Sequence, residues 1–501
     1  MYSAEDVNKD EKASEEEKKA EPTPMVSYKD LFRFADRFDE MLMIIGTFGA
    51  LGQGALLPAQ FIIFGDLSDS FIDYTQCLHP LSNCTSIPNI EEEMKPFAYY
   101  YIAIAVAMAV AVAIRMVAWG LTAERQVHSM RKAFFKSILR QEMAWFDTND
   151  AGELNSRLSD DLNKIADGIG HKFASFQYCI AGFICGYILG FFYGWILTLV
   201  ILSLFPVIAL SGGFLGWVIT GFTTKELKAY SEAGSVAQEV LSSFRTVAAF
   251  GGEEKETERY SSRLGAARKM GERKGLANGL GMGVFNFIMF CSYALAFWYG
   301  AKLVIDKEMT GGNLLIVFFT VMVGSILAGQ GGPSMQGIAS ARGAAYHVYE
   351  LIDRTPAIDI SSEDGVAPEL LEGNVDFEDI SFTYPSRPDI QILNGFTLSV
   401  PKGKRVALVG ESGCGKSTVV KLIQRFYDIA EGNLSIDGRA VKTYNLKWLR
   451  QHIGVVSQEP VLFATTVAEN IRYGRDDATQ EEIEEAAKMA NAHEFISAMP
   501  K

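Results

Sequence analysis

Arg405-Val406-Ala407-Leu408-Val409 leads into Gly410-Glu411-Ser412-Gly413-Cys414-Gly415-Lys416-Ser417-Thr418. The first five residues predict a buried strand, and residues 419–423 have helical character. The pattern Gly-x4-Gly-Lys-Ser therefore stands between a strand and a helix, which is the setting that a P-loop requires. In such a loop, backbone N–H groups and the helix N-terminus surround the phosphates of a nucleotide. The sequence thus predicts an α/β nucleotide-binding domain.

Each part of the loop has an expected role toward ATP and Mg²⁺. The glycines let the backbone wrap closely around phosphates. Lys416 is expected to reach the β and γ phosphates, Ser417 to bind Mg²⁺ through its hydroxyl, and Thr418 to add a phosphate contact. The predicted ATP-binding residues of the loop are Gly410, Glu411, Ser412, Gly413, Cys414, Gly415, Lys416, Ser417 and Thr418.

Two residues outside the loop are further candidates for the nucleotide site. Tyr384 ends a predicted strand upstream, and its ring is suited to stacking on adenine, although a tyrosine in a strand is more often a packing residue. Gln458 follows a second predicted strand, residues 453–457. It is positioned to touch both Mg²⁺ and a neighbouring domain, but alone it is only a polar loop residue.

The N-terminal part of the chain has the composition of a membrane domain. The chain is 49% hydrophobic with a mean hydropathy of +0.10. Each uncharged run is near or above the ~20 residues that a membrane-spanning helix needs, and the third is more than twice as long. Tyr193-Gly194-Trp195 predicts a turn inside that third run, so six spans are expected rather than buried helices of a soluble protein. The runs are 41–65, 96–114, 173–224, 275–301 and 309–341.

Loop charge predicts the orientation. Residues 66–95 contain only Lys95, whereas 120–172 and 225–274 are rich in Lys and Arg and are expected on the cytoplasmic side. Six spans then place the N-terminus and the nucleotide loop in the cytoplasm.

Residues 1–27 are expected to form a disordered acidic tail. The net charge of −14 argues against a nucleic-acid partner.

The loop expected outside carries two candidate modifications. Asn83-Cys84-Thr85 is a glycosylation acceptor pattern, so Asn83 is a candidate for a glycan. Cys77 and Cys84 are expected either to form a disulfide or to remain free thiols, and the sequence favours neither.

Arg115 lies at the cytoplasmic end of the uncharged run 96–114 and has two interpretations. It is either a counter-ion for anionic cargo or, the favoured interpretation, a side chain that snorkels to the cytoplasmic interface.

Several motifs together resemble ATP-binding cassette exporters of the multidrug-resistance, P-glycoprotein-like subfamily B. The resemblance covers about residues 28–501. It implies a type I exporter fold, with a six-helix transmembrane bundle over 28–345, a linker over 346–373, and the N-terminal part of an α/β cassette over 374–501. The motifs are Phe382-Thr383-Tyr384-Pro385, residues 410–418, residues 456–463, Trp145-Phe146-Asp147, residues 152–158, residues 243–247 and residues 341–346.

The resemblance also assigns roles. It implies that Tyr384 stacks on adenine, that residues 410–418 form the Walker A loop, that Gln458 joins Ser417 at Mg²⁺, and that coupling helices lie near 145–160 and 230–250. It further implies a substrate cavity between the spans, although plain packing or lipid-facing roles are equally expected for its residues. The cavity candidates are Phe61, Phe64, Phe290, Tyr293, Phe318, Phe319, Met322 and Gln330.

The sequence departs from the family pattern near its end. Lys501 comes before any Leu-Ser-Gly-Gly-Gln signature, any strand ending in Asp-Glu, and any switch histidine. No catalytic residue is therefore assigned, and this chain alone is expected to turn ATP over very slowly, whereas the complete protein is expected to be an ATPase-coupled translocase.

The resemblance implies a membrane exporter. The expected function is ATP-driven export of amphipathic or hydrophobic compounds, such as xenobiotics, lipids or bile-salt-like molecules, by alternating access in the plasma membrane. The expected partners are small amphipathic substrates, membrane lipid and a second transporter half with its own cassette. Two alternatives remain: a non-hydrolysing ATP-binding partner of a full-length transporter, and an ATP-gated channel.

Overall fold

The structure is a computed structural model. It describes residues 24–78, 90–149, 152, 154, 157–411, 413–458 and 460–499, with only the backbone of 205, 208, 209 and 266. The chain divides into two compact units. The first unit contains residues up to Met130 and Asp161–Tyr346, and the second contains Arg131–Asp160 and the residues from His347 onward. The second unit therefore includes a segment that the sequence placed inside a continuous transmembrane domain.

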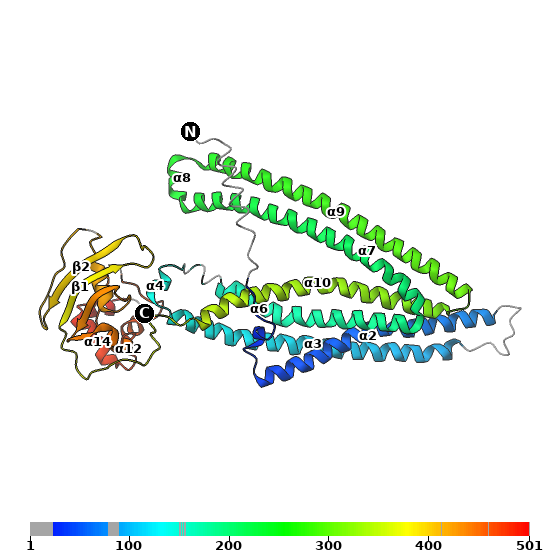
Figure 1. Ribbon diagram of the computed structural model, residues 1–501, viewed down its shortest axis with the longest axis horizontal. Coiled ribbons are helices and arrows are strands. Elements are labelled where there is room, and N and C mark those ends of the chain that lie inside the picture. The colour runs from blue at the N-terminus through cyan, green and yellow to red at the C-terminus, as the bar shows by residue number, and fades with distance from the viewer. Residues whose placement is uncertain are drawn as a thin grey trace. The chain divides into compact units, whose positions relative to one another are not determined.

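Long helices build the first unit (Figure 1). Its elements are η1 (Asp30–Phe32), α2 (Arg37–Cys77), α3 (Ile90–Arg140, which continues into the second unit), α6 (Leu162–Asp167), η3 (Gly168–Lys172), α7 (Phe173–Ser242), α8 (Phe244–Phe250), α9 (Glu253–Ile305) and α10 (Gly311–Asp353, which ends in the second unit). The short η2 (Arg157–Asp161) begins in the second unit and ends in the first. An Asp36 capping box with Asp39 starts α2, because each side chain accepts a hydrogen bond from the other residue's backbone N–H.

Five helical segments of the described chain are long and apolar enough to cross a membrane. They are Arg37–Cys77, Ile90–Arg140, Arg157–Leu204, Glu253–Ile305 and Gly311–Asp353. Within α7, Gly194 leaves the helical conformation at φ −172° and ψ 81°, so two helical segments meet there at a kink. Figure 1 shows that α7 folds back on itself. This is the position where the sequence predicts a turn. The sixth crossing that the sequence expects from α7 stays a prediction, because only the first part of α7 is among the five candidate spans of the described residues.

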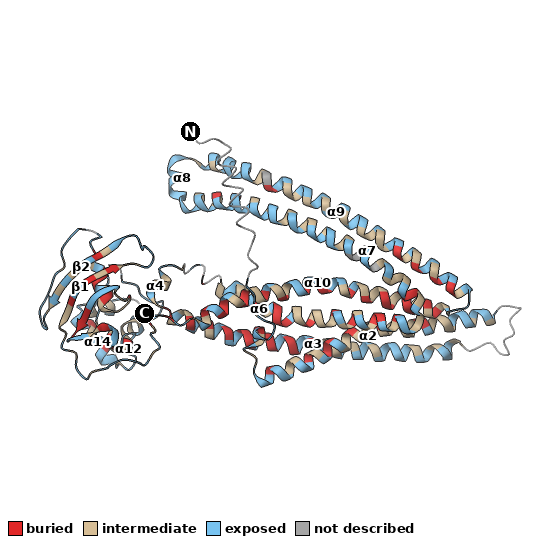
Figure 2. Cartoon of the chain, in the orientation of Figure 1, coloured by how far each residue is buried: buried red, intermediate tan, exposed pale blue. Residues whose placement is uncertain are grey.

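Close helix contacts depend on glycine. A Cβ on Gly54 of α2 would lie 2.6 Å from the Ala181 Cβ and 2.8 Å from the Gly182 backbone nitrogen of α7. The absence of a side chain thus allows direct backbone contact between α2 and α7, as small residues do between membrane helices. By contrast, most of α8 and the adjoining turns of α7 and α9 are exposed (Figure 2).

The second unit combines a sheet with short helices. The strands are β1 (Val375–Thr383), β2 (Gln391–Val400), β3 (Glu431–Ile436) and β4 (Arg439–Ala440), paired antiparallel in the order β2-β1-β3-β4. The helices are α4 (Met143–Phe146), α11 (Lys416–Ile423), η4 (Val441–Thr443), α12 (Leu446–Gln451), α13 (Val467–Arg472), α14 (Gln480–Met489) and α15 (His493–Ser497). The apolar faces of β1 and α11 meet in the core, which includes Phe377, Ile380, Phe382, Val419 and Leu422.

Two strand predictions are wrong for this structure. Residues 405–409 and 453–457 form no strand, and Val409 and Val456 are 93% and 100% exposed. A strand requires hydrogen bonds from a neighbouring strand, and no other described segment pairs with either stretch. The apolar pattern indicates that a segment is suited to burial, but not what covers it. The helix predicted at 419–423 is confirmed by α11.

Candidate nucleotide-binding site

The loop before α11 has the backbone geometry of an anion cradle. Gly413 and Gly415 adopt φ values of +88° and +91°, which residues with a Cβ rarely adopt. A Cβ on Gly415 would also lie 2.8 Å from the Leu393 Cδ2. These turns bring the chain directly into the N-terminus of α11, where unpaired backbone N–H groups favour negative charge. The loop therefore fits a phosphate group.

Lys416 points back over its own loop. Its Nζ donates hydrogen bonds to the carbonyl oxygens of Gly410 at 2.9 Å and Glu411 at 2.6 Å, and it lies 3.5 Å from the Cys414 Sγ. The ammonium group is thus held beside the loop by weak neutral acceptors. Phosphate oxygens are stronger acceptors for it because they carry charge.

Tyr384 lies beside the first turns of α11. Its hydroxyl is 3.0 Å from the buried Thr418 Oγ1, and the Lys421 Nζ lies 5.3 Å from its ring centroid. The ring also packs edge-on against Phe382 and Tyr427, with centroid distances of 5.0 and 5.2 Å. The structure therefore brings Tyr384 to the loop as the sequence suggests. Its adenine contact and the phosphate contact of Thr418 stay predictions.

The predicted Mg²⁺ ligands are not joined by any contact. Ser417 is exposed on α11, and exposed Gln458 forms no hydrogen bond within the described chain. Ser412 lies outside the described residues. No cluster of His, Cys, Asp or Glu in the described ranges could hold a metal ion. A serine hydroxyl and a glutamine amide still fit Mg²⁺, because this ion often takes most of its ligands from water and bound phosphates.

Sequence reasoning missed how the α4 segment docks. The Tyr427 hydroxyl donates a 2.6 Å hydrogen bond to the Asp147 Oδ2, and Ala144 of α4 packs against the core of the second unit. Burial raises the pKa of Tyr427, and the Asp147 acceptor raises it further. The motif Trp145-Phe146-Asp147 was visible in the sequence, but nothing local indicates a partner 280 residues away.

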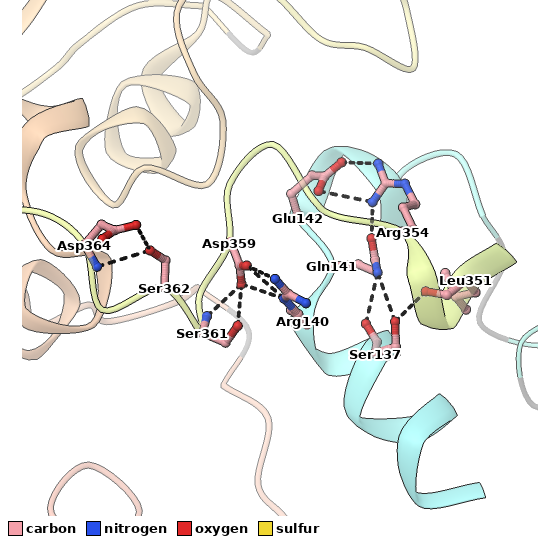
Figure 3. Close-up of polar contacts among 10 residues, drawn as sticks. All are labelled: Ser137, Arg140, Gln141, Glu142, Leu351, Arg354, Asp359, Ser361, Ser362 and Asp364. Atoms are coloured by element: carbon pink, nitrogen blue, oxygen red, sulfur yellow. Dashed lines mark hydrogen bonds and ion pairs between the residues drawn. The ribbon is translucent and has the colours of Figure 1, made fainter. Parts of the chain in front are cut away.

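Two ion pairs, which we call the linker clamp, fasten the end of α3 to the segment after α10 (Figure 3). In the first pair, the Arg140 Nε donates to both Asp359 oxygens, at 2.9 and 2.8 Å. Ser361 donates to the same carboxylate from its backbone nitrogen and its hydroxyl. The hydrogen bond from Arg140 outweighs partial burial and holds the pKa of Asp359 far below its usual range.

The second pair joins Arg354 to Glu142. The Arg354 Nη2 donates to the Glu142 Oε1 at 2.5 Å, and Arg354 also contacts Gln141. Burial alone would raise the pKa of Glu142, but the bond from Arg354 and backbone N–H donors lower it overall. One turn earlier, the buried Ser137 hydroxyl donates to the Leu351 carbonyl oxygen at 2.5 Å. The sequence offered no signal for these pairs, because the partners are more than 200 residues apart.

Six of the predicted cavity residues form one continuous set of ring contacts in the first unit, which we call the ring cluster: Phe61, Phe64, Phe290, Tyr293, Phe318 and Phe319. Phe319 stacks on Phe61 at 5.1 Å and meets Phe64 at 5.6 Å. Phe318 extends the set to Tyr293 at 5.3 Å. Met322 is half-buried and Gln330 is exposed, and neither takes part in these ring contacts. A cavity role for all eight residues stays a prediction.

The outer-loop predictions fall largely outside the described chain. Asn83 and Cys84 lie in the undescribed range 79–89. Cys77 is disulfide-bonded, whereas Cys179, Cys185, Cys291 and Cys414 are free. Of the two alternatives for Cys77, the structure therefore has the disulfide and not the free thiol. Its pairing with Cys84 and the glycan on Asn83 stay predictions.

A bundle of membrane-length helices followed by a P-loop unit defines a multi-pass membrane protein with a nucleotide-binding domain. The family model for the ABC transporter transmembrane region matches residues 43–326, and the ABC transporter model matches residues 393–500. The chain therefore belongs to the ABC transporter family and has the type I exporter arrangement, with the membrane domain before the ATP-binding domain.

Named relatives agree on the subfamily. ABC transporter B family member 2 of Dictyostelium discoideum is 44% identical over 97% of this chain. ATP-binding cassette sub-family B member 5 of Homo sapiens is 45% identical over 94%, and ABC transporter B family member 21 of Arabidopsis thaliana is 40% identical over 96%. The chain spans only 35%, 38% and 36% of the lengths of these three relatives.

Proposed function

We propose that the protein to which this chain belongs exports amphipathic or hydrophobic compounds across a membrane, driven by ATP. The observation that carries the proposal is the 2.6 Å bond between Tyr427 and Asp147. Asp147 follows α3, a helix of membrane-spanning length, and Tyr427 lies in the core of the unit that contains the P-loop. A change in the nucleotide domain is thereby passed to a membrane helix.

ATP with Mg²⁺ is the proposed energy source. Lys416 and the N-terminal N–H groups of α11 hold the phosphates, Ser417 and Gln458 bind Mg²⁺, and Tyr384 contacts adenine. Support comes from the left-handed glycines of the loop and from the position of Lys416 over it. ATP shifts the equilibrium between inward-facing and outward-facing states only through a difference in its affinity for them. Closure on a second cassette, from another transporter half, supplies that difference.

The cargo class is proposed from the ring cluster. Aromatic rings that contact one another along α2, α9 and α10 offer a broad apolar surface, with Met322 and Gln330 nearby in sequence. Adaptable apolar surfaces accept amphipathic molecules of different shapes, including xenobiotics, lipids and bile-salt-like compounds. We propose that the N-terminus and the nucleotide domain lie in the cytoplasm, because Lys and Arg are concentrated in residues 120–172 and 225–274. The plasma membrane is the proposed location.

The test is ATP hydrolysis by the whole protein in lipid vesicles. We expect hydrolysis to rise when amphipathic compounds are added, and accumulation of those compounds inside inside-out vesicles. Lys416→Met should abolish both, and Lys488→Met, which removes an exposed lysine of α14, should change neither. A flat response to a broad compound panel contradicts the cargo class. ATP-dependent ion current without compound transport identifies a channel instead.

A further inference from the structure

Arg115 of α3 is a buried cation with no carboxylate partner among the described residues. Its side chain lies inside the first unit, and the residue is only 7% exposed. The Nη1 lies 3.5 Å from the Ser175 Oγ, and the guanidinium carbon lies 5.4 Å from the ring centroid of Tyr178. No other hydrogen bond, ion pair or ring contact of Arg115 occurs in the described chain, and its Nε has no hydrogen-bond partner there.

The prediction that Arg115 snorkels to the interface is wrong. A snorkelling side chain keeps its charged group in water, whereas this one is enclosed. Trp119, Thr122 and Gln126 follow Arg115 toward the C-terminal end of α3, and they are themselves only 0–1% exposed. Across the contact, a Cβ on Gly49 of α2 would lie 2.8 Å from the Arg115 backbone nitrogen, so α2 covers this face closely.

The same face of α3 carries three more buried polar groups without partners. The Trp119 Nε1, the Thr122 Oγ1 and both amide atoms of Gln126 form no hydrogen bond with the described residues. Spacings of four, three and four residues place Arg115 and these groups along one side of the helix. Buried polar atoms in native proteins are nearly always paired. Four neighbouring side chains that each keep at least one polar atom unpaired in the described chain therefore mark a place where a group from outside the protein completes the hydrogen bonding.

The chemistry of this row favours an anion. The guanidinium group remains protonated in proteins, and a buried charge is strongly disfavoured unless it is balanced. Tyr178 offers a favourable ring face but no negative charge. Arg115, Trp119 and Gln126 each present an N–H donor, and the planar fork of arginine matches the two oxygens of a carboxylate or phosphate.

We propose that the buried row Arg115, Trp119, Thr122 and Gln126 of α3 is an oxyanion-binding site centred on Arg115. The ligand is a carboxylate or phosphate group. Arg115 directly follows the uncharged run 96–114, so it lies at the end of a predicted span that faces the cytoplasm. The oxyanion therefore comes either from the headgroup of an amphiphile in the inner leaflet or from a free anion in the cytosol. The site does not depend on the cargo or on ATP.

The test measures the thermal unfolding midpoint of the full chain in phosphatidylcholine nanodiscs. Dodecyl phosphate and inorganic phosphate are titrated separately, and dodecyl maltoside serves as a neutral amphiphile with the same tail. A ligand that binds only the folded state raises the midpoint in a saturable way. We expect a saturable rise with an oxyanion and none with dodecyl maltoside. A rise with dodecyl phosphate alone identifies a headgroup site, and an equal rise with inorganic phosphate identifies a free-anion site.

Variants decide whether Arg115 is responsible. Arg115→Gln should weaken the oxyanion response at least about tenfold, the loss that corresponds to ~1.4 kcal/mol of binding free energy. Arg115→Lys, which keeps the charge, should retain part of the response even if Arg115→Gln folds poorly. Arg263→Gln, an exposed arginine of α9, is the matched control. The proposal is overturned if Arg115→Gln responds like the unmodified chain, or if no oxyanion raises the thermal midpoint of the unmodified chain.

Discussion

Tyr427 donates a 2.6 Å hydrogen bond to Asp147, and this bond joins the core of the nucleotide-binding unit to the segment that follows α3. The Tyr427 ring separately packs against Phe382 and Tyr384. The hydroxyl and the ring therefore have different tasks: the ring belongs to the core, and the hydroxyl reaches the docked segment.

Tyr427→Phe should loosen the docking without disrupting the core. It retains the ring contacts and removes one hydrogen bond to a charged acceptor, worth ~1.5–3 kcal/mol. We expect nucleotide binding to be retained and stimulation of ATP hydrolysis by amphipathic compounds to fall several-fold in the whole protein. Tyr473→Phe is the control, because its exposed hydroxyl forms no hydrogen bond in the described chain. Unchanged stimulation in Tyr427→Phe would show that this bond does not couple the nucleotide domain to the membrane helices.

The linker clamp gives a prediction about local order. Arg140→Gln and Asp359→Asn each remove one side of a bidentate, partly buried pair, so both should increase amide hydrogen exchange over residues 354–362. Because the two variants break the same interaction, the double variant should exchange little faster than either single one. Additive effects would instead mean that the two side chains act independently. Arg268→Gln, which breaks an exposed pair on α9, should leave this segment unchanged.

The same pair predicts a dependence on pH. The pKa of Asp359 is lower in the folded protein than in the unfolded chain, so its carboxylate stabilises the fold above the unfolded pKa of ~3.9. That stabilisation is lost as the pH falls through the range between the unfolded and folded values. We expect the difference in thermal midpoint between the unmodified chain and Asp359→Asn to be largest near neutral pH and to shrink below about pH 4. A difference that stays constant down to pH 3 contradicts the assignment.

Local patterns explain what the sequence predicted well. The turn at Gly194, the start of α11 at Lys416 and the position of Tyr384 after β1 all follow from a few neighbouring residues. The linker clamp and the Tyr427–Asp147 bond join residues that are far apart in the chain, so no local pattern reveals them. The strand predicted at 405–409 shows the same limit, because pairing depends on a neighbouring strand.

Arg115 is the clearest case in which the sequence was ambiguous. Its position at the end of an uncharged run suits either an interfacial or a buried side chain. The outcome depends on α2 and α7, which enclose it and whose packing the α3 sequence does not contain.

Gly415→Ala tests the loop geometry. Alanine is strained at φ +91°, and its Cβ would lie 2.8 Å from the Leu393 Cδ2. The strain of ~1–2 kcal/mol for a left-handed residue should displace the start of α11 and weaken binding of a fluorescent ATP analogue about tenfold or more. Gly454→Ala is the control, since its backbone is not left-handed and its Cβ would meet no atom within 4 Å. Equal affinity of the two variants would contradict the cradle geometry.

Phe319 is the most connected member of the ring cluster and gives the sharpest test of the cargo surface. It contacts Phe61, Phe64 and Phe318, whereas Phe290, at the edge of the cluster, contacts Tyr293 alone among its members. If the cluster binds cargo, Phe319→Ala should raise the concentration of amphipathic compound that half-maximally stimulates ATP hydrolysis by about tenfold, and Phe290→Ala should raise it less. Phe319→Leu separates binding from packing, because it keeps most of the apolar volume and removes the ring. If the concentration for half-maximal stimulation in all three variants equals that of the unmodified protein, the cluster serves helix packing alone.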